Sequence, residues 1–402
     1  MRCMEFSARH DISERRWGVY ALLSWMLLFA VVAVKVVRYN DISNECLVYA
    51  PASWNWWAGR DLYYVATIDG FLYLPQAAIL YTPFAWLGHP VGDIVWRLFG
   101  LSLFCGGLWR LADVFSRAHA VRVFAVGSFV ALFPTFNALR NGQANLPMAG
   151  IMLISVADLI ERRWWRAAIW LALGFAIKPI ILVLILLAAA IYRPMSWRLP
   201  VALAVCMLMP FAAGGFHYVL HQYDLCWIKM TMSAQPDRAF SDLRGLLWSL
   251  GWMMPMRLYT ALQLVAAVGT LWLCARALRR WPEPAGSAFV LTLCCCYLML
   301  FNPRTEENSY VILTPMIALP AGLLFLDDRR RWAAWVLVAL SIGLTGNLWG
   351  YKLTVYWLKP LTCVIFVVLV LRELFRNNIS AWRGVGGVAI ETAGPTVSAG
   401  AE

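Results

Sequence analysis

The chain has 402 residues, of which 61% are hydrophobic and 14% are charged. Soluble proteins are about 45–50% apolar and about 25% charged, so this chain cannot cover itself with a polar surface and is expected to be solvated by lipid. The net charge is +12, yet the arginines stand in short clusters between apolar runs, which is the topology signal of membrane proteins rather than of nucleic-acid-binding proteins. Composition and charge thus exclude a soluble globular protein and argue against a nucleic-acid partner.

Apolar runs long enough to cross a hydrocarbon core of about 30 Å recur along the chain. The run 164–192 contains Lys178 and Pro179 in its middle, and a proline breaks a helix because it removes a backbone donor. We divide this run into two short spans, which brings the total to about twelve. The predicted fold is an all-α, polytopic transmembrane helical bundle, with spans at 17–37, 91–110, 121–136, 145–161, 164–178, 179–192, 197–213, 257–278, 286–301, 309–326, 333–349 and 356–374.

Arginine placement predicts the orientation, because positive residues concentrate in cytoplasmic loops. With the N-terminus inside, arginines occur in every predicted inner segment, namely 1–16, 110–122, 161–166, 192–198, 276–284, 327–332 and 372–383. The main predicted outer loops are 38–90, 137–145, 214–256 and 302–308. We therefore predict a multi-pass inner-membrane protein with a cytoplasmic N-terminus (1–16), a transmembrane domain (17–374) and a partly disordered cytoplasmic tail (375–402).

The first outer loop, 38–90, is long and rich in aromatic residues. Loops longer than about 15 residues are usually functional or disordered, and aromatic richness argues against disorder. Within this loop, 73–87 is apolar but short, and it contains Pro75 and Pro83. A full span there would reverse the sidedness of the next arginine-containing loop, so we expect an interfacial or re-entrant helix.

Candidate catalytic carboxylates follow the first span by a few residues. Asp41 and Glu45 lie in the aromatic loop, and a carboxylate half covered by aromatic rings can act as a general base. The alternative is a solvated loop acid or a helix N-cap. The pattern leaves the choice between the two carboxylates open.

Two groups of polar residues interrupt the apolar spans. The turn 137–145 contains Arg140, Gln143 and Asn145 around a glycine, which lets the backbone approach a ligand closely; the alternative is a capped interhelical turn. Lys178 stands at the predicted helix break, and ionisable groups within membranes often mark a binding path. Its alternative is an ammonium that snorkels to the interface.

Arg97 lies inside its predicted span and allows the same two interpretations as the lysine. The loop 302–308 combines Arg304 with two acids, and a guanidinium matches phosphate oxygens in a fork; the alternative is an internally paired turn. The five histidines are scattered and no cysteine pair has zinc spacing, so we expect neither a metal site nor a cofactor.

A series of short motifs occurs in an ordered arrangement along the chain. The motifs are Val48-Tyr49-Ala50, Gly59-Arg60-Asp61-Leu62-Tyr63, Tyr73-Leu74-Pro75, Gly142-Gln143-Ala144-Asn145, Lys178-Pro179, and Asn302-Pro303 ahead of Tyr310. In this order and spacing the chain resembles the polyprenol-phosphate-mannose-dependent mannosyltransferases, glycosyltransferase family 87, of the membrane C-type superfamily. The resemblance adds Tyr49 and Arg60 to the residues expected to contact substrate.

This resemblance implies a specific reaction. A hexosyl group, mannosyl in the family, would pass from a polyprenyl phosphate to a glycolipid or glycan acceptor on the outer face of the membrane, with inversion and without a nucleotide sugar. The family's base is a first-loop Asp shortly before the Val-Tyr pair, where this chain has Glu45, with Asp41 four residues earlier. Near the late loop, Asn308 stands where the family often has a histidine.

A departing lipid phosphate is a stable anion, so it requires cations rather than an acid. Lys178, Arg140 and Arg304 are the candidates, with Gln143 and Asn145 as neutral partners. A transporter or flippase of lipid-linked or small polar substrates is the alternative, but it predicts paired broken helices in two similar halves, and we predict one broken run, at Lys178-Pro179. The transferase interpretation requires an outer cavity that the cations share with the base.

Overall fold

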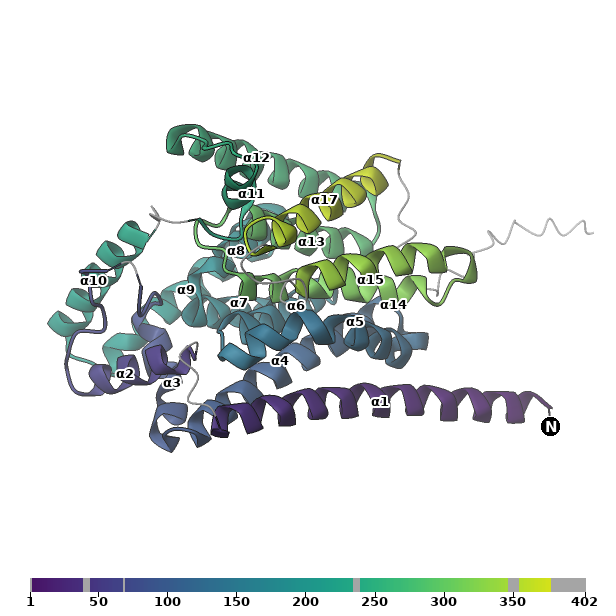
Figure 1. The fold of residues 1–402 in the computed structure, drawn as a ribbon, viewed down its shortest axis with the longest axis horizontal. Coiled ribbons are helices and arrows are strands. Elements are labelled where there is room, and N and C mark those ends of the chain that lie inside the picture. The colour runs from purple at the N-terminus through teal and green to yellow at the C-terminus, as the bar shows by residue number, and fades with distance from the viewer. Residues whose placement is uncertain (1, 39–43, 68, 234–238, 346–353, 377–402) are drawn as a thin grey trace, which may run out of the picture.

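The computed structural model describes residues 2–38, 44–67, 69–233, 239–345 and 354–376, with side chains from residue 14 onward. These residues form helices and connecting loops without strands (Figure 1), so the all-α prediction is confirmed for the described part of the chain. The α-helices are α1 (Arg2–Arg38), α2 (Cys46–Trp57), α3 (Pro75–Leu87), α4 (Val91–Phe115), α5 (Ala120–Asn141), α6 (Asn145–Ile160), α7 (Trp164–Ile177), α8 (Leu182–Ile191), α9 (Met195–Leu208), α10 (Phe216–Ser233), α11 (Leu243–Ser249), α12 (Met256–Arg280), α13 (Ala285–Phe301), α14 (Thr314–Leu324), α15 (Arg331–Thr345) and α17 (Leu358–Arg376). Short 3-10 helices are η1 (Arg117–His119), η2 (Pro179–Ile181), η3 (Met209–Ala212), η4 (Glu307–Ile312) and η5 (Asp328–Arg330).

Several helices have the length and composition of membrane spans. Within the described residues, five helices meet both criteria: Glu14–Arg38, Val91–Phe115, Arg117–Asn141, Met195–Ala212 and Met256–Arg280. Four apolar helices are shorter: Asn145–Ile160, Trp164–Ile177, Pro179–Ile191 and Ala285–Phe301. A count of about twelve full-length spans therefore stays a prediction, because several of the predicted spans are short or broken helices.

The predicted late spans differ from the structure in their helical content. The stretch 309–326 is not one α-helix, because η4 precedes an α14 of only 11 residues that begins beside Pro315. A proline lacks the N–H needed inside a helix, so it favours a helix start at that point. The span 333–349 is helical to Thr345, and its remainder lies outside the described residues. In the first outer loop, within the stretch 73–87, residues Pro75–Leu87 form the 13-residue helix α3.

The outer-loop segments of the sequence analysis gather at one end of the bundle. In Figure 1, α2, α3 and α10 lie at the end opposite the N-terminus of α1. The backbone N–H of Glu45 donates to the carbonyl of Asn141 at 2.9 Å, and the N–H of Leu62 donates to Gln222 at 3.0 Å. These contacts join the loops 38–90, 137–145 and 214–256, so residues far apart in sequence share one pole.

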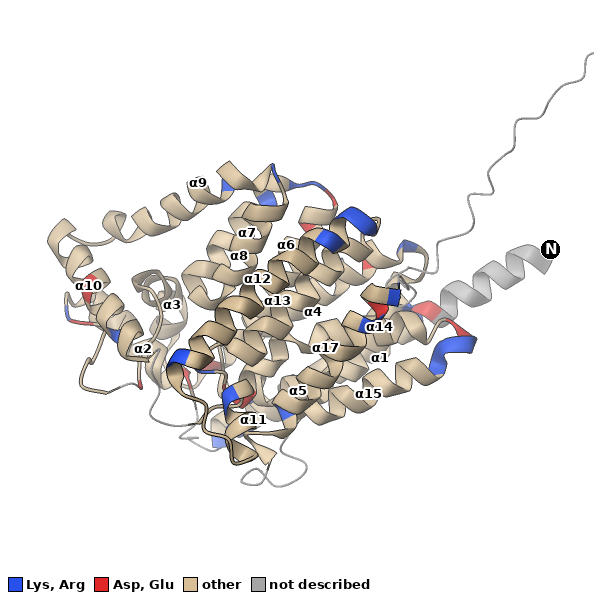
Figure 2. Ribbon diagram, turned by 90° about the horizontal axis from the view of Figure 1, so that it is seen from above, with Lys and Arg blue, Asp and Glu red and all other residues tan. Residues whose placement is uncertain are grey.

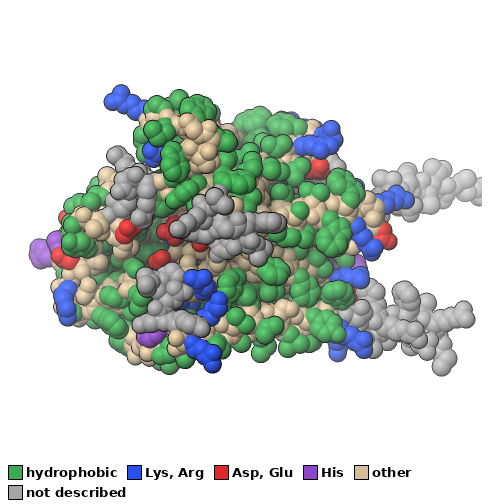
Figure 3. All heavy atoms as spheres, viewed as in Figure 1, with side chains coloured by type: hydrophobic (Ala, Val, Ile, Leu, Met, Phe, Trp, Pro, Cys, Tyr) green, Lys and Arg blue, Asp and Glu red, His purple; other side chains and the backbone are tan. Residues whose placement is uncertain are grey.

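Three of the predicted inner segments meet at the opposite pole. His119 lies 3.4 Å from Glu14, and Arg110 pairs with Glu161, which joins the segments 1–16, 110–122 and 161–166. Lysine and arginine ribbons appear near both poles in Figure 2, and hydrophobic side chains cover much of the visible face between them in Figure 3. Which pole faces the cytoplasm stays a prediction.

Glycine permits close packing of α4 against α6. A Cβ added at Gly150 would lie 2.4 Å from the carbonyl oxygen of Leu103, and one at Gly107 would lie 2.6 Å from the oxygen of Gly150. Neither position accepts a side chain without moving a backbone. Small residues let membrane helices approach closely, and this contact sets the turn before α6 against α4.

Candidate active site

A cavity of about 520 Å³ lies among the loops of the outer-loop pole. Its charged and amide groups come from separate chain segments. Glu45 stands at the N-cap of α2, Gln143 lies between α5 and α6, and Lys178 occupies the break between α7 and η2. Arg304 and Glu306 come from the loop after α13. The fold thus brings carboxylates, an amide and two cations to one space.

The break at Lys178 follows directly from the sequence. Lys178 has an extended backbone with φ −152° and ψ 113°, because the following Pro179 disfavours the helical conformation for the residue before it. The N–H of Lys178 still closes α7 by donating to Gly174 at 2.8 Å. The interruption of the two short helices therefore places the ammonium on the cavity wall.

Hydrogen bonds connect the cation to the acids through two amides. The Lys178 Nζ donates to Asn145 Oδ1 at 2.7 Å, and Asn145 Nδ2 donates to Gln143 Oε1 at 3.2 Å. The Gln143 Nε2 then donates to Glu45 Oε1 at 3.1 Å and to Glu306 Oε2 at 2.9 Å. The two carboxylates are therefore held by the same amide group.

The electrostatic setting of Glu45 suits proton transfer near neutral pH. Burial is the main cause that raises the pKa of Glu45 to about 7; the neighbouring charges of Glu306 and Asp69 add to the rise, while Lys178 and Arg304 oppose it. A general base works best with a pKa near the operating pH. Glu45 can therefore take up a proton that a reacting hydroxyl releases.

Arg304 is the second cation that lines the cavity. Its guanidinium donates to Asp69 Oδ1 at 2.9 Å and stacks over the Phe240 ring, whose centroid is 5.3 Å away. Both contacts hold the planar group at the cavity wall. A guanidinium held in this way presents further N–H donors for a phosphate oxygen.

A small apolar pocket of about 90 Å³ adjoins the polar cavity. Tyr73 lines both spaces, and its hydroxyl lies 2.9 Å from that of Tyr49. The Tyr49 hydroxyl also accepts a hydrogen bond from the N–H of Ala144 at 3.2 Å. The rest of the pocket is formed by aromatic and aliphatic side chains of α3, α4 and α7, namely Ala77, Leu80, Tyr81, Phe84, Trp96, Phe99, Leu173 and Ile177. The polar cavity and the apolar pocket thus share one wall.

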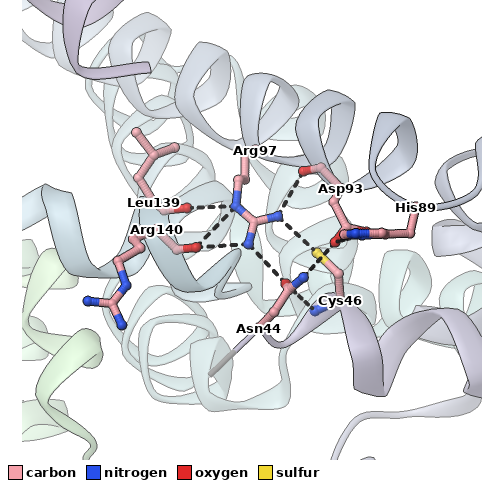
Figure 4. A network of polar contacts seen from close by, with 7 residues as sticks. All are labelled: Asn44, Cys46, His89, Asp93, Arg97, Leu139 and Arg140. Atoms are coloured by element: carbon pink, nitrogen blue, oxygen red, sulfur yellow. Dashed lines mark hydrogen bonds and ion pairs between the residues drawn. The ribbon is translucent and has the colours of Figure 1, made fainter. Parts of the chain in front are cut away.

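Arg97 anchors the segment next to the cavity. Its side chain is only 2% exposed and donates to the carbonyls of Leu139 and Arg140 at the end of α5, at 3.1 and 2.8 Å (Figure 4). It also donates to Asn44 Oδ1 at 2.9 Å, and Asn44 in turn donates to Asp93. The guanidinium therefore caps a helix and holds the residue before Glu45.

Gly142 is required by this arrangement. Its φ of +64° is one that residues with a side chain rarely adopt, and an added Cβ would lie 3.1 Å from the guanidinium carbon of Arg97. The same turn is held by Trp96, whose Nε1 donates to the Gly142 carbonyl at 2.8 Å. The glycine lets the chain turn sharply from α5 into the residue that binds both acids, Gln143.

We expect Arg97→Met to destabilise the protein. The substitution removes the Arg97 donors from the carbonyls of Leu139 and Arg140 and from Asn44, and losing a buried hydrogen bond to a charged group costs about 1–3 kcal/mol. The midpoint of thermal unfolding in detergent should fall clearly below that of the unmodified protein. The matched control is Arg117→Ala, whose side chain is 79% exposed, and it should change stability by no more than about 0.5 kcal/mol. Equal midpoints for both variants would contradict the anchoring role.

The remaining residues predicted for the site occupy other places. Arg140 is absent from the cavity lining, and in Figure 4 its side chain points away from Arg97. Its charge acts on Glu307, where burial raises the pKa of the carboxyl and Lys359 and Arg140 oppose that shift. Arg60 is exposed on the first loop.

Asn145 is 1% exposed and holds its neighbours rather than lining the cavity. Asp41, one of the two predicted bases, lies outside the described residues. The choice between Asp41 and Glu45 therefore stays open on the geometry, although Glu45 is the one that the structure places on the cavity wall.

Two acids of the cavity receive no role in the sequence analysis. Glu306 belongs to the loop that we singled out for its mixture of a cation and two acids, but no pattern distinguishes it from Glu307. Asp69 lies in the long aromatic loop and pairs with Arg304 across 235 residues of sequence. The late-loop charge cluster was a usable signal for Glu306, whereas no sequence signal pointed to Asp69.

A helical, lipid-solvated chain whose loops gather acids and cations in one cavity has the makeup of a membrane-embedded transferase. The chain belongs to glycosyltransferase family 87, whose model matches residues 71–303. The match includes Gln143 and Lys178, while Glu45 and Arg304 lie outside it. The resemblance inferred from the motifs is thereby confirmed, and the protein is a membrane glycosyltransferase.

Two characterised relatives extend the comparison. The chain is 25% identical to the polyprenol-phosphate-mannose-dependent alpha-(1-2)-phosphatidylinositol mannoside mannosyltransferase of Mycolicibacterium smegmatis, over 96% of this chain and 90% of the relative. It is also 25% identical to the protein of the same description from Mycobacterium tuberculosis, over 81% of this chain and 80% of the relative. The likeness therefore spans nearly the whole chain.

Proposed function

We propose that the protein transfers a mannosyl group from a polyprenyl phosphate donor to a hydroxyl of a lipid or glycan acceptor, on the outer face of a bacterial inner membrane and with inversion. One observation carries this proposal: Glu45, Lys178 and Arg304 line the same cavity at the pole formed by the predicted outer loops. The printed names of both relatives, which specify a polyprenol-phosphate-mannose donor, support the donor class.

In this reaction one bond to C1 of the sugar forms and another breaks. The acceptor oxygen forms a bond to C1 of the sugar, and the bond between C1 and the phosphate oxygen breaks. The acceptor proton passes to the carboxylate of Glu45, and the electron pair of the broken bond leaves on polyprenyl phosphate. Lys178 and Arg304 stabilise the negative charge that grows on that phosphate, which is usually the largest catalytic contribution in such sites.

The apolar surroundings suit a lipid donor. The aromatic pocket beside Tyr73 adjoins the polar cavity. The isoprene end of the donor next to its phosphate can therefore pack against apolar side chains. Tyr73 and the aromatic loop cover one side of the cavity and reduce access of water to the sugar. Excluding water from such a site strengthens its electrostatic interactions and limits hydrolysis.

Purified protein tests the reaction directly. We expect it to transfer labelled mannose from polyprenyl phosphate mannose to a component of a bacterial lipid and glycan extract, and nuclear magnetic resonance should show inversion at C1. A nucleotide sugar offered in place of the lipid donor should give no product. Efficient use of the nucleotide sugar, or no transfer from any polyprenyl phosphate sugar, would refute the proposal.

Sidedness is tested by cysteine labelling of two exposed positions at opposite poles. Tyr64 is 70% exposed near the cavity, and Arg117 is 79% exposed at the other end. An impermeant thiol reagent should label Tyr64→Cys in intact spheroplasts and Arg117→Cys only after permeabilisation. The reverse pattern would show that the cavity faces the cytoplasm and would contradict a reaction on the outer face.

A further inference from the structure

We propose that Asn145 is a positioning residue, which acts through Gln143 to aim one amide group at the base Glu45. The inference rests on the proposed function, because that function makes Glu45 the base. Asn145 is 1% exposed and does not line the cavity, so it cannot act by touching the donor or the acceptor. Its influence has to pass through the side chains that it holds.

The direction of each hydrogen bond follows from the chemistry of Lys178. An ammonium only donates, so the Asn145 group that faces it at 2.7 Å must be the carbonyl oxygen Oδ1. The Asn145 Nδ2 then faces the other way and donates to Gln143 Oε1 and to Ser309 Oγ, both at 3.2 Å. The Gln143 amide is thereby turned so that its nitrogen faces the acids.

The nitrogen of Gln143 has two hydrogens and two carboxylate partners. It donates to Glu45 at 3.1 Å and to Glu306 at 2.9 Å. Hydrogen bonds to the charged form of a carboxylate stabilise that form, so the amide counteracts the burial that favours a protonated Glu45. The reverse amide orientation would present an oxygen to both acids and repel their charged forms.

The same lysine has two tasks in this arrangement. An ammonium carries three N–H donors, so its bond to Asn145 leaves others for a phosphate oxygen in the cavity that it lines. The group that binds the leaving phosphate therefore also sets the orientation of the amide beside the base. Phosphate binding and proton transfer share one line of hydrogen bonds from Lys178 to Glu45.

Asn145→Asp tests the relay with little change in shape. The new carboxylate still accepts from Lys178, but it cannot donate to Gln143 Oε1, so the Gln143 amide is expected to turn around. The apparent pKa of Glu45 should then rise by about one pH unit or more, because a hydrogen bond to a charged group is replaced by repulsion. The acid limb of kcat/KM for mannosyl transfer should move upward by the same amount.

A double-mutant cycle separates the relay from the added charge. In a Gln143→Leu background, the relay predicts that Asn145→Asp loses most of its effect on the pH profile, whereas a purely electrostatic effect would persist. The neutral variant Asn145→Ser should also raise the apparent pKa of Glu45, but by less than Asn145→Asp does. It provides the test if the aspartate variant fails to fold. Ser155→Ala, a buried hydroxyl on the same helix, should leave the profile unchanged.

Infrared difference titration of the purified protein makes the test independent of turnover. The carboxyl band that disappears in Glu45→Gln reports the protonation of Glu45, and its midpoint should shift upward in Asn145→Asp and in Asn145→Ser. Unshifted midpoints in both, or an equal shift in the Gln143→Leu background, would overturn the relay. If the unmodified protein transfers no sugar, the proposed function fails, and the infrared midpoints still decide the relay.

Discussion

Glu45→Gln is expected to lower kcat/KM for mannosyl transfer by about 10²–10⁴-fold, the range that general base catalysis contributes. The amide is nearly isosteric and keeps a hydrogen-bonding oxygen toward Gln143, but it cannot accept the acceptor proton. Binding of the polyprenyl phosphate donor should change little, since Lys178 and Arg304 remain. Donor affinity measured with the non-transferable polyprenyl phosphate product separates the two effects.

The pH profile gives a second view of the same group. The base works only when deprotonated, and burial raises the pKa of Glu45 to about 7, so activity should be low below that pH and rise as the pH passes through it. Asp224→Asn, which removes an exposed acid of α10 at the same pole, should keep both the rate and the profile. Full activity in Glu45→Gln would mean that another group, such as Asp41, is the base.

Lys178→Met is expected to lower kcat by about 10²–10³-fold, the cost of removing one group that stabilises transition-state charge. The methionine is of similar length and apolar, so it preserves the packing of the break between α7 and η2. The loss should fall more on kcat than on donor affinity, because the phosphate gains negative charge as its bond to the sugar breaks.

The matched control for Lys178 is Lys35→Met. Lys35 is exposed near the end of α1 and lies 5.3 Å from the centre of the Phe136 ring, outside the cavity. Its replacement should leave kcat unchanged. A Lys178→Met variant with a normal kcat and a raised KM would assign this lysine to ground-state binding alone and would contradict its role at the leaving group.

Local patterns in the sequence were enough to predict several parts of this site. The helix break beside Pro179 follows from proline's missing N–H, and it identifies Lys178 as an ionisable group at a helix end. The all-α architecture follows from the long continuous apolar runs, because in lipid such a run satisfies its own backbone hydrogen bonds as a helix. Gln143 stood out because a glycine turn between apolar runs carries a cluster of amides.

Tertiary structure alone decided which of the polar groups meet. Glu45 and Glu306 share one amide although 261 positions separate them, and Asp69 pairs with Arg304. Arg140 looked equivalent to Lys178 in sequence, but at the end of α5 its side chain points away from Arg97 and its charge acts on Glu307.

Lipid solvation, the helical class and the segments that interrupt the helices could all be predicted from the amino-acid sequence, because these features depend on neighbouring residues. The pairing of acids with cations depends on how the loops pack together at one pole. Side-chain direction at a helix end depends on the rotation of that helix against its neighbours. That rotation is set by contacts such as Gly150 against Leu103, between residues far apart in the chain.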